Sequence, residues 1–351
     1  MSKVLMKGNE AIGEAAVIAG CRYFFGYPIT PQSELPHYMV KRLPQVGGVF
    51  LQAESEVSAI NMVYGSAGCG ARVMTSSSSP GLSLKLEGIS YIAASELPCV
   101  IVNIVRGGPG LGSIQPAQSD YFQATKGGGH GDYRMVVYAP SSVQEIVDLT
   151  IKAFNVADDY RNPVMILGDG LLGQMMEPVT LPEMVTYSPD KPWATMGMKD
   201  GKRNVINSLH IVPEENAEFN VHLQTKYQQM TDKEIMFEDY RVDDAEYVVV
   251  AYGSSARVAK GAVDKAREQG LKVGLIRPIT LWPFPEQHIN QVAQRVKAFL
   301  CVEMSMGQMV EDVRLAVNGQ KPVEFYGVAG GMVPTVNDVV KQLEEIARRE
   351  A

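Results

Sequence analysis

Turns that could bind an anionic ligand recur through the first half of this sequence. Each joins a hydroxyl, carboxylate or guanidinium side chain to small or ring-constrained residues, and each precedes or opens a stretch of helical composition. Helix N-termini attract anions through their free N–H groups and their dipole. The turns therefore suggest recognition of a phosphate or a carboxylate. They are Tyr27-Pro28-Ile29-Thr30-Pro31, Gln52-Ala53-Glu54-Ser55-Glu56, Ser76-Ser77-Ser78-Ser79-Pro80-Gly81 and Arg106-Gly107-Gly108-Pro109-Gly110-Leu111-Gly112.

Thr30 and Arg106 are the candidate anion-binding side chains of these turns. Pro31 suits the first position of a helix and Thr30 is a natural N-cap, so we expect a helix over Pro31–Arg42. Taken alone, a rigid and well-capped turn is the preferred interpretation of Thr30. Arg106 lies between a predicted strand and a glycine-rich loop. It either binds a carboxylate through paired hydrogen bonds or lies at the surface beside a mobile loop.

Glu54 and Glu56 begin another predicted helix, and a carboxylate there is a candidate for proton transfer. Acidic residues in a first turn usually only complement the helix dipole. The helix that follows presents a small and apolar face between Ala59 and Ala67, which predicts deep burial. A glutamate at the mouth of a buried helix is a candidate for a tuned protonation equilibrium.

His130 and the cysteines could also carry chemistry. His130 follows a run of glycines in a loop, where a lone histidine is more often incidental than catalytic, and no second histidine stands at metal-ligand spacing. The four cysteines form no CxxC pair, so this chain alone cannot build a zinc site or an iron–sulfur cluster. We expect all four to be small buried side chains.

Short apolar runs alternate with helical segments through the first half of the chain, which predicts an α/β fold. The runs are continuously apolar, as in parallel doubly wound sheets with helices on both faces. Ligands bind such sheets beyond the carboxyl ends of the strands, where the turns above would lie. The predicted strands are Arg22–Tyr27, Gly48–Gln52, Arg72–Ser76, Cys99–Arg106, Arg134–Tyr138 and Pro163–Leu167. The predicted helices are Asn9–Ala19, Pro31–Arg42, Ser55–Cys69, Pro80–Ala94 and Ser142–Ala157.

A change of rhythm divides the chain into three parts. Residues 1–182 form one predicted domain, and residues 241–351 repeat the α/β alternation in a smaller one. Residues 183–240 carry scattered prolines and charges, so we expect an irregular linking segment there that could contact a partner subunit. The fold class is thus α/β, with two doubly wound domains joined by an irregular linker.

Composition excludes two classes of partner. The net charge of −7 and the pI near 5.4, without any basic run, argue against nucleic acid. The apolar run Cys99–Val105 is too short to span a membrane and is interrupted by Asn103. The first residues show no signal-peptide pattern, so we expect a cytoplasmic protein.

In their order along the chain, these motifs resemble the α-type subunit of 2-oxoacid:ferredoxin oxidoreductases. The likeness covers nearly the whole chain. It is closest to the 3-methyl-2-oxobutanoate type, with the 2-oxoglutarate type as a near relative. It implies that residues 1–182 are a thiamine diphosphate pyrimidine-binding domain and that residues 241–351 are a transketolase C-terminal-like domain. Besides the first-half turns and His130-Gly131-Asp132, the matching segments are Arg277-Pro278-Ile279-Thr280-Leu281-Trp282-Pro283-Phe284-Pro285 and Val302-Glu303-Met304-Ser305-Met306-Gly307-Gln308.

The resemblance implies a complex whose subunits share the cofactor. A β subunit with a diphosphate-binding domain would carry Mg²⁺ and an iron–sulfur cluster, and γ and ferredoxin-like subunits would complete the assembly. Two gaps in this sequence agree with that division. There is no cluster-binding cysteine pattern, and Gly168-Asp169-Gly170 lacks the asparagine pair that would complete a magnesium motif. The implied reaction converts a 2-oxoacid and coenzyme A to acyl-CoA, CO2 and reduced ferredoxin.

The family motif also implies which glutamate acts. Counted back from the small-residue helix face, Glu56 fits the glutamate that contacts N1′ of the aminopyrimidine ring better than Glu54 does. A carboxylate sharing a proton with N1′ favours the imino tautomer, which then removes the thiazolium C2 proton.

The turns would supply the other contacts. Pro28, Ile29 and Thr30 would border the cofactor. Thr30 and Arg106 would contact the carboxylate and carbonyl of the substrate, and His130 is a further substrate-binding candidate. The resemblance therefore reverses the interpretation of Thr30 as part of a plain turn.

Two other functions stay open. The β subunit of an NAD-linked 2-oxoacid dehydrogenase shares both domain types, although the motif order speaks against it. A non-catalytic subunit that stabilises or regulates a partner would keep the fold without using the chemistry of Glu56.

Overall fold

The apolar runs of the first half assemble into one mostly parallel sheet. The structure, a computed structural model, describes residues 3–184, 189–198 and 201–349. Six neighbouring strands of the seven-stranded sheet run parallel, and an antiparallel strand from the second half of the chain completes one edge. In spatial order the strands are β12 (Thr280–Trp282), β6 (Val136–Tyr138), β7 (Pro163–Asp169), β5 (Cys99–Val105), β4 (Val73–Ser77), β2 (Tyr23–Gly26) and β3 (Val49–Gln52).

Helices cover both faces of this sheet, as the continuously apolar strands predict. One group packs α1 between α2 and α7, and the other packs α3 against α5. Right-handed crossovers between parallel strands place the two groups on opposite faces. The helices are α1 (Gly8–Ile18), α2 (Glu34–Arg42), α3 (Glu56–Gly68), α4 (Ser79–Ser83), α5 (Leu86–Ala94), α6 (Tyr121–Thr125), α7 (Val143–Tyr160) and α8 (Gly170–Gln174).

Two helix predictions for this domain need correction. The first turn of α2 begins at Glu34, so Thr30 is not its N-cap and Pro31 is not its first residue. The reason is Pro36, whose ring nitrogen has no hydrogen and is tolerated only in the first turn of a helix. The predicted helix Pro80–Ala94 is divided into α4 and α5, with Lys85 at the break.

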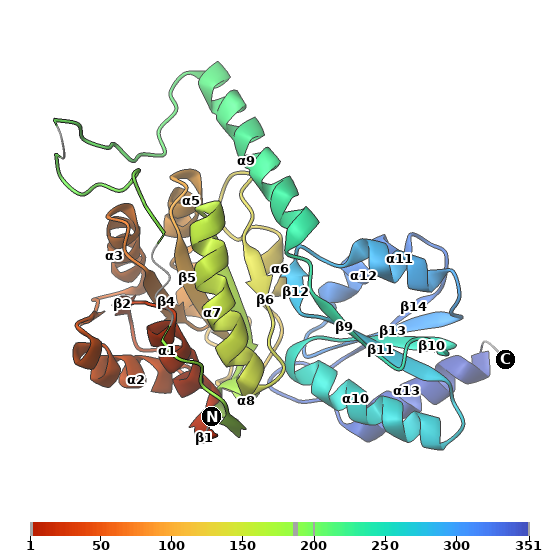
Figure 1. Cartoon of the computed structure of the whole chain (residues 1–351). Helices are drawn as coiled ribbons and strands as arrows, with labels where there is room; N and C mark the ends of the chain where they lie inside the picture. The colour runs from red at the N-terminus through yellow and green to blue at the C-terminus, as the bar shows by residue number, and fades with distance from the viewer. Residues whose placement is uncertain (1–2, 185–188, 199–200, 350–351) are drawn as a thin grey trace.

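The second half of the chain forms a smaller α/β unit (Figure 1). Its five-stranded sheet has the order β14 (Val323–Gly327), β13 (Ala298–Glu303), β10 (Tyr247–Val250), β11 (Val273–Pro278) and β9 (Phe237–Tyr240). All pairs are parallel except β11 with β9. The helices are α10 (Gly253–Glu268), α11 (Glu286–Ala293), α12 (Met309–Val317) and α13 (Val336–Arg349).

The linking segment is more regular than its composition suggests. It contains the 21-residue helix α9 (Pro213–Lys233), which rises from the body of the molecule (Figure 1), and β9. The apolar stripe of α9 is confined to its second half, where Leu223, Tyr227 and Met230 are buried. The sequence therefore shows no long amphipathic pattern that would predict the helix. The division at residues 182 and 240 stays a prediction. β1 (Val4–Lys7) and β8 (Met176–Val179), only four residues each, form a separate antiparallel pair.

Buried polar side chains fasten the two halves together. Gln118, which is buried, donates from its amide to the carbonyl of Tyr252 (2.9 Å). Its amide oxygen accepts from the Ser255 hydroxyl (2.6 Å) and from the Met304 N–H (3.0 Å). The apolar core is also continuous across this junction, since buried residues of both halves belong to one cluster. The segment that follows the glycine-rich loop is therefore held by the second half.

Substituting Gln118 tests this junction. We expect Gln118→Ala to lower the free energy of unfolding by about 2–4 kcal/mol, because buried partners on the other half lose their hydrogen bonds. Gln228→Ala on α9, where the amide is exposed and bonds only Asp232, is the control and should change stability by less than about 0.5 kcal/mol. Urea unfolding of the purified protein measures both variants. Equal losses of unfolding free energy would contradict the role of Gln118 in joining the two halves.

Candidate active site

Three of the predicted site residues come to one edge of the large sheet. Thr30 follows β2, Glu56 follows β3, and Arg106 follows β5. These strands run parallel within one sheet, so their carboxyl ends lie at the same edge. The edge is the place where doubly wound sheets bind ligands.

Glu56 is a buried carboxylate at the start of a helix. It is the first residue of α3 and is only 6% exposed, whereas Glu54 is exposed. Ser55 is the N-cap, and its hydroxyl accepts from the Ser58 N–H (3.2 Å). Of the two glutamates, only Glu56 is thus shielded from water that would compete for a hydrogen bond to its carboxylate.

Gly81 makes room for this carboxylate. A Cβ at position 81 would lie 2.5 Å from Glu56 Oε1 and 2.3 Å from Ser77 Oγ, both well inside van der Waals contact. The glycine of the Ser79-Pro80-Gly81 turn thus allows α4 to approach the N-terminus of α3 closely. The turns after β3 and β4 therefore build one site.

Arg106 connects the glycine-rich loop to the turn that contains Thr30. Its guanidinium, 7% exposed, donates through Nη1 to the Thr30 carbonyl (3.0 Å) and through Nη2 to the Leu111 carbonyl (3.2 Å). The side chain of Thr30 and the neighbouring Pro28 are exposed, and Ile29 is partly buried. Arg106 therefore holds the turn through its backbone, while the Thr30 side chain stays exposed.

Ser79 links the Arg106 backbone to a partly buried acid, Asp120, that sequence reasoning missed. The Ser79 hydroxyl accepts from the Arg106 N–H (3.1 Å) and donates to Asp120 Oδ2 (2.7 Å). Asn103 donates to the same oxygen (2.9 Å) and accepts from the Ser79 N–H (3.1 Å). Burial raises the pKa of Asp120, while these hydrogen bonds lower it. Asn103 was the available signal, since a polar residue inside a fully buried strand needs a partner.

Several buried polar atoms at this edge have no hydrogen-bond partner in the described part of the chain. They are Ser77 Oγ, Ser78 Oγ, Gln32 Nε2 and Arg106 Nε. Buried polar groups are nearly always hydrogen-bonded, so such a group of exceptions points to a ligand. Hydroxyl, amide and guanidinium groups beside the Glu56 carboxylate match the donors and acceptors of an aminopyrimidine ring and of a 2-oxoacid. The residues present therefore fit half of a thiamine diphosphate site.

His130 is not brought to this group. Its side chain is exposed and its ring stands edge-on to Tyr91 on α5, with 5.7 Å between the ring centres. It borders a separate cavity of about 230 Å³ that Phe219 of α9 also lines. A substrate contact by His130 stays a prediction, and the site that we describe does not include it.

A cavity of about 450 Å³ adjoins the site between the two halves of the chain. It is lined by Ser79 and Asp120, by the glycine-rich loop from Gly107 to Gly110, and by Met306 of the second half. The cavity therefore lies beside the glycine-rich loop that follows Arg106.

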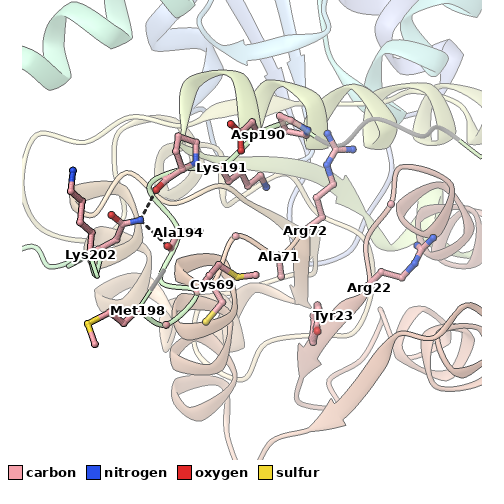
Figure 2. A pocket seen from close by; sticks show the side chains of 17 residues that line it. Arg22, Tyr23, Cys69, Ala71, Arg72, Asp190, Lys191, Ala194, Met198 and Lys202 are labelled. Carbon is pink, nitrogen blue, oxygen red and sulfur yellow. Dashed lines mark hydrogen bonds between the residues drawn. The ribbon is translucent and has the colours of Figure 1, made fainter. Parts of the chain in front are cut away.

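A cavity of about 1320 Å³ lies elsewhere (Figure 2). Arg22 and Arg72 on its wall precede β2 and β4, so it adjoins the amino ends of the strands, at the edge opposite Glu56. Lys191 on its wall is paired with Asp158 (2.5 Å). The cavity also exposes Cys69, which corrects the expectation that all four cysteines are buried. Cys69 follows the last turn of α3, beyond the helix face that packs on the sheet.

Comparisons with known proteins agree with this geometry. Residues 14–245 match the family described as "Pyruvate flavodoxin/ferredoxin oxidoreductase, thiamine diP-bdg", and residues 245–339 match "Pyruvate:ferredoxin oxidoreductase core domain II". Ketoisovalerate oxidoreductase subunit VorB of Methanothermobacter marburgensis is 52% identical over 348 residues, covering 99% of each chain. 2-Oxoglutarate synthase subunit KorA of the same organism is 36% identical and covers 96% of this chain and 97% of its own.

Solved structures extend the likeness to three dimensions. The 2-oxoglutarate:ferredoxin oxidoreductase from Magnetococcus marinus superposes with a TM-score of 0.87 at 27% identity and covers 98% of this chain. This chain spans 65% of the length of that one. A split-gene transketolase matches with a TM-score of 0.63 at 14% identity over 99% of both chains, a likeness of fold alone.

The chain belongs to the pyruvate and 2-oxoacid:ferredoxin oxidoreductase family, and the family and the α/β fold class expected from the sequence are confirmed. It is a subunit of the thiamine diphosphate-dependent oxidoreductase type. Its relatives are named as subunits, in keeping with a multi-subunit complex. Within the described ranges, no helix is long and apolar enough to cross a membrane.

Replacing Gly81 tests the close approach of α4 to Glu56. We expect Gly81→Ala to weaken thiamine diphosphate binding by the complex at least about tenfold, because the new methyl group displaces the Glu56 carboxylate. The loss of thermal stability should be small, since the clashing atoms are side-chain ends that can rotate. Gly65→Ala on the exposed side of α3, where a Cβ meets nothing within 4 Å, is the matched control. Calorimetric titration measures the affinity, and unchanged binding by Gly81→Ala would contradict the geometry.

Proposed function

We propose that this chain provides the pyrimidine-binding half of a thiamine diphosphate site in a complex that oxidises 3-methyl-2-oxobutanoate. The complex would convert the acid and coenzyme A to acyl-CoA, CO2 and reduced ferredoxin in the cytoplasm. The observation that carries the proposal is the buried Glu56 carboxylate over Gly81, beside hydroxyl and amide groups without partners. The identity to a ketoisovalerate oxidoreductase subunit supports the choice of substrate.

Glu56 holds and moves a proton at the aminopyrimidine ring. Its carboxylate exchanges a proton with N1′, and its burial excludes the water that would otherwise compete for that hydrogen bond. Pro28, Ile29 and Thr30 border the ring from the turn after β2. Thiamine diphosphate, when bound, supplies the electron sink for decarboxylation of a 2-oxoacid.

Thr30 and Arg106 bind the substrate. The Arg106 Nε–H has no partner among the described residues, and each terminal nitrogen donates only one hydrogen bond to a carbonyl. The guanidinium therefore keeps donors for the substrate carboxylate, and the exposed Thr30 hydroxyl can donate to the 2-oxo group. Because the Ser79 hydroxyl fixes the Arg106 backbone, the clamp is set before substrate binds.

Partner subunits complete the site. A β subunit with a diphosphate-binding domain holds Mg²⁺ and an iron–sulfur cluster, and γ and ferredoxin-like subunits pass electrons to ferredoxin. Apolar side chains exposed around the same edge support this assembly, since exposed apolar patches mark contact surfaces. Leu111 in the glycine-rich loop is 85% exposed, and Leu84 and Val57 are exposed beside Gly81 and Glu56. Asp169, in the turn Gly168-Asp169-Gly170, caps α8 by accepting from the Leu171 and Leu172 N–H groups.

The second candidate substrate is 2-oxoglutarate, favoured by the KorA relatives at 36% identity. Dye-reduction assays of the purified complex with 3-methyl-2-oxobutanoate, 2-oxoglutarate and pyruvate decide between them. We expect the highest kcat/KM for the branched-chain acid. A higher value for 2-oxoglutarate would move the chain to the dicarboxylate type, which needs a second cation in the pocket.

Removing the carboxylate of Glu56 tests the mechanism. We expect Glu56→Gln to leave the complex assembled and to lower the decarboxylation rate at least about a hundredfold, the usual scale of general acid–base catalysis. Glu54→Gln changes an exposed carboxylate two positions away in the same turn and should keep activity within about twofold. Single-turnover release of CO2 with size-exclusion chromatography measures both effects. Full activity of Glu56→Gln would leave a non-catalytic role for this chain.

A further inference from the structure

Lys85 is a fully buried cation behind the site. It lies at the break between α4 and α5 and is 0% exposed. Its Nζ donates to Thr75 Oγ1 (2.6 Å) and to the Ser76 carbonyl (3.0 Å), both on β4. Lysine is almost never fully buried without an acidic partner. Neither of these hydrogen-bond partners is charged, so the two bonds alone do not explain how the fold tolerates a buried ammonium group at this position.

Glu56 is the acidic group that Lys85 faces. Burial lowers the pKa of Lys85 to about 7, and the Glu56 carboxylate opposes that shift. In the described part of the chain, no other charged group acts on Lys85 strongly enough to move its pKa, and no hydrogen bond joins it directly to Glu56. The geometry places the two groups at the same end of β4. Lys85 bonds the Ser76 carbonyl, and a Cβ at Gly81, four residues before Lys85, would lie 2.5 Å from Glu56 Oε1 and 2.3 Å from Ser77 Oγ.

A second connection leads from Lys85 to the substrate turn. The Ser76 carbonyl accepts from Lys85, and the Ser76 hydroxyl donates to Gln32 Oε1 (2.5 Å). Gln32 follows Thr30 by two residues, is buried, and has an amide nitrogen without a partner. Lys85 is thus connected both to the Glu56 carboxylate, through its charge, and to the Thr30 turn, through Ser76 and Gln32.

Lys226 shows what a structural buried lysine looks like in this fold. It is buried on α9 and forms an ion pair with Glu96 (3.1 Å), which is the common solution for a buried ammonium. Lys85 lacks such a pair, and its counter-charge lies at the ligand-binding edge. The contrast indicates that Lys85 serves the site and not only the stability of the sheet.

We propose that Lys85 is a positioning residue for the reaction, whose charge beside the Glu56 carboxylate favours residence of the exchanged proton on the cofactor ring nitrogen. This inference rests on the proposed function. A buried carboxyl group without a nearby cation retains its own proton more strongly. The proton moves between Glu56 and N1′ only, and Lys85 acts through its charge.

The test uses the assembled complex with two variants. Lys85→Met keeps an unbranched side chain one atom shorter and removes its charge, and Lys85→Arg keeps a permanent charge. Calorimetry measures the dissociation constant of thiamine diphosphate between pH 5 and pH 7, where Lys85, with its pKa of about 7, carries its charge. Binding takes up a proton wherever the empty site has an ionised Glu56, and the affinity then weakens as pH rises. In Lys85→Met, we expect this weakening to begin at least about one pH unit higher, equivalent to about tenfold in proton affinity.

In Lys85→Arg, the affinity for thiamine diphosphate should begin to weaken at the same pH as in the unaltered complex, or at a lower pH. The rate of thiamine C2 proton exchange with deuterium, followed by NMR after acid quench, should fall about tenfold in Lys85→Met and recover to within about threefold in Lys85→Arg. Lys226→Met is the matched control, expected to lower thermal stability without moving the pH dependence of cofactor binding.

The outcomes separate this inference from the proposed function. If Glu56→Gln loses exchange while Lys85→Met keeps both the rate and the pH dependence, the role of Lys85 is overturned and that of Glu56 stands. If Glu56→Gln keeps full exchange, the proposed function fails regardless of Lys85. Should Lys85→Met fail to fold, Lys85→Arg decides alone, because a pH dependence moved upward in that variant contradicts the proposal.

Discussion

The site depends on a single close approach, that of the Glu56 carboxylate to the backbone at Gly81. A carboxylate is costly to bury, and here the end of α3 and the turn after β4 must meet with no side chain between them. Ser77 Oγ lies at the same point. α4, which begins at Ser79, is thereby placed so that the Ser79 hydroxyl accepts from the Arg106 N–H. The geometry of one glycine thus fixes how the turns after β3, β4 and β5 lie together.

The second half of the chain contributes to the site by restraint. The segment after the glycine-rich loop is fastened by Gln118 to Tyr252 and Met304, and by Gln308, which bonds the Ser119 carbonyl and the Phe122 N–H. Asp120, the acid that anchors Ser79, lies inside this fastened segment. An antiparallel strand of the second half, β12, also closes the large sheet. Loss of the second half would therefore loosen the arginine clamp even though none of the predicted site residues comes from it.

Sequence patterns were sufficient for the elements with strong local signals. Continuous apolar runs predicted β4, β5 and β7 closely, and the small-residue face predicted the burial of α3 and led to Glu56. Patterns failed where a contact from elsewhere decides the structure. The start of α2 depends on Pro36, β12 exists only by pairing with β6, and α9 buries only its second half.

Site residues divide in the same way. Thr30, Glu56 and Arg106 lie in turns whose composition is unusual, so they could be found along the chain. Asp120 and Lys85 could not, because their roles arise from side-chain contacts with other elements: Asp120 accepts from Asn103 on β5, and Lys85 donates to Thr75 on β4. A polar residue inside an apolar strand, such as Asn103, is the one sequence signal that pointed toward this buried network.

These features describe one half of a cofactor site, complete in its proton-exchanging carboxylate and its substrate turn and open toward a partner. The most direct measurement is the structure of the purified complex with thiamine diphosphate bound. The account predicts that a Glu56 carboxylate oxygen lies within hydrogen-bonding distance, about 2.6–3.2 Å, of N1′ of the aminopyrimidine ring, with the diphosphate held by a partner subunit. A ring nitrogen facing any other side chain, or a cofactor held entirely within this chain, would contradict it.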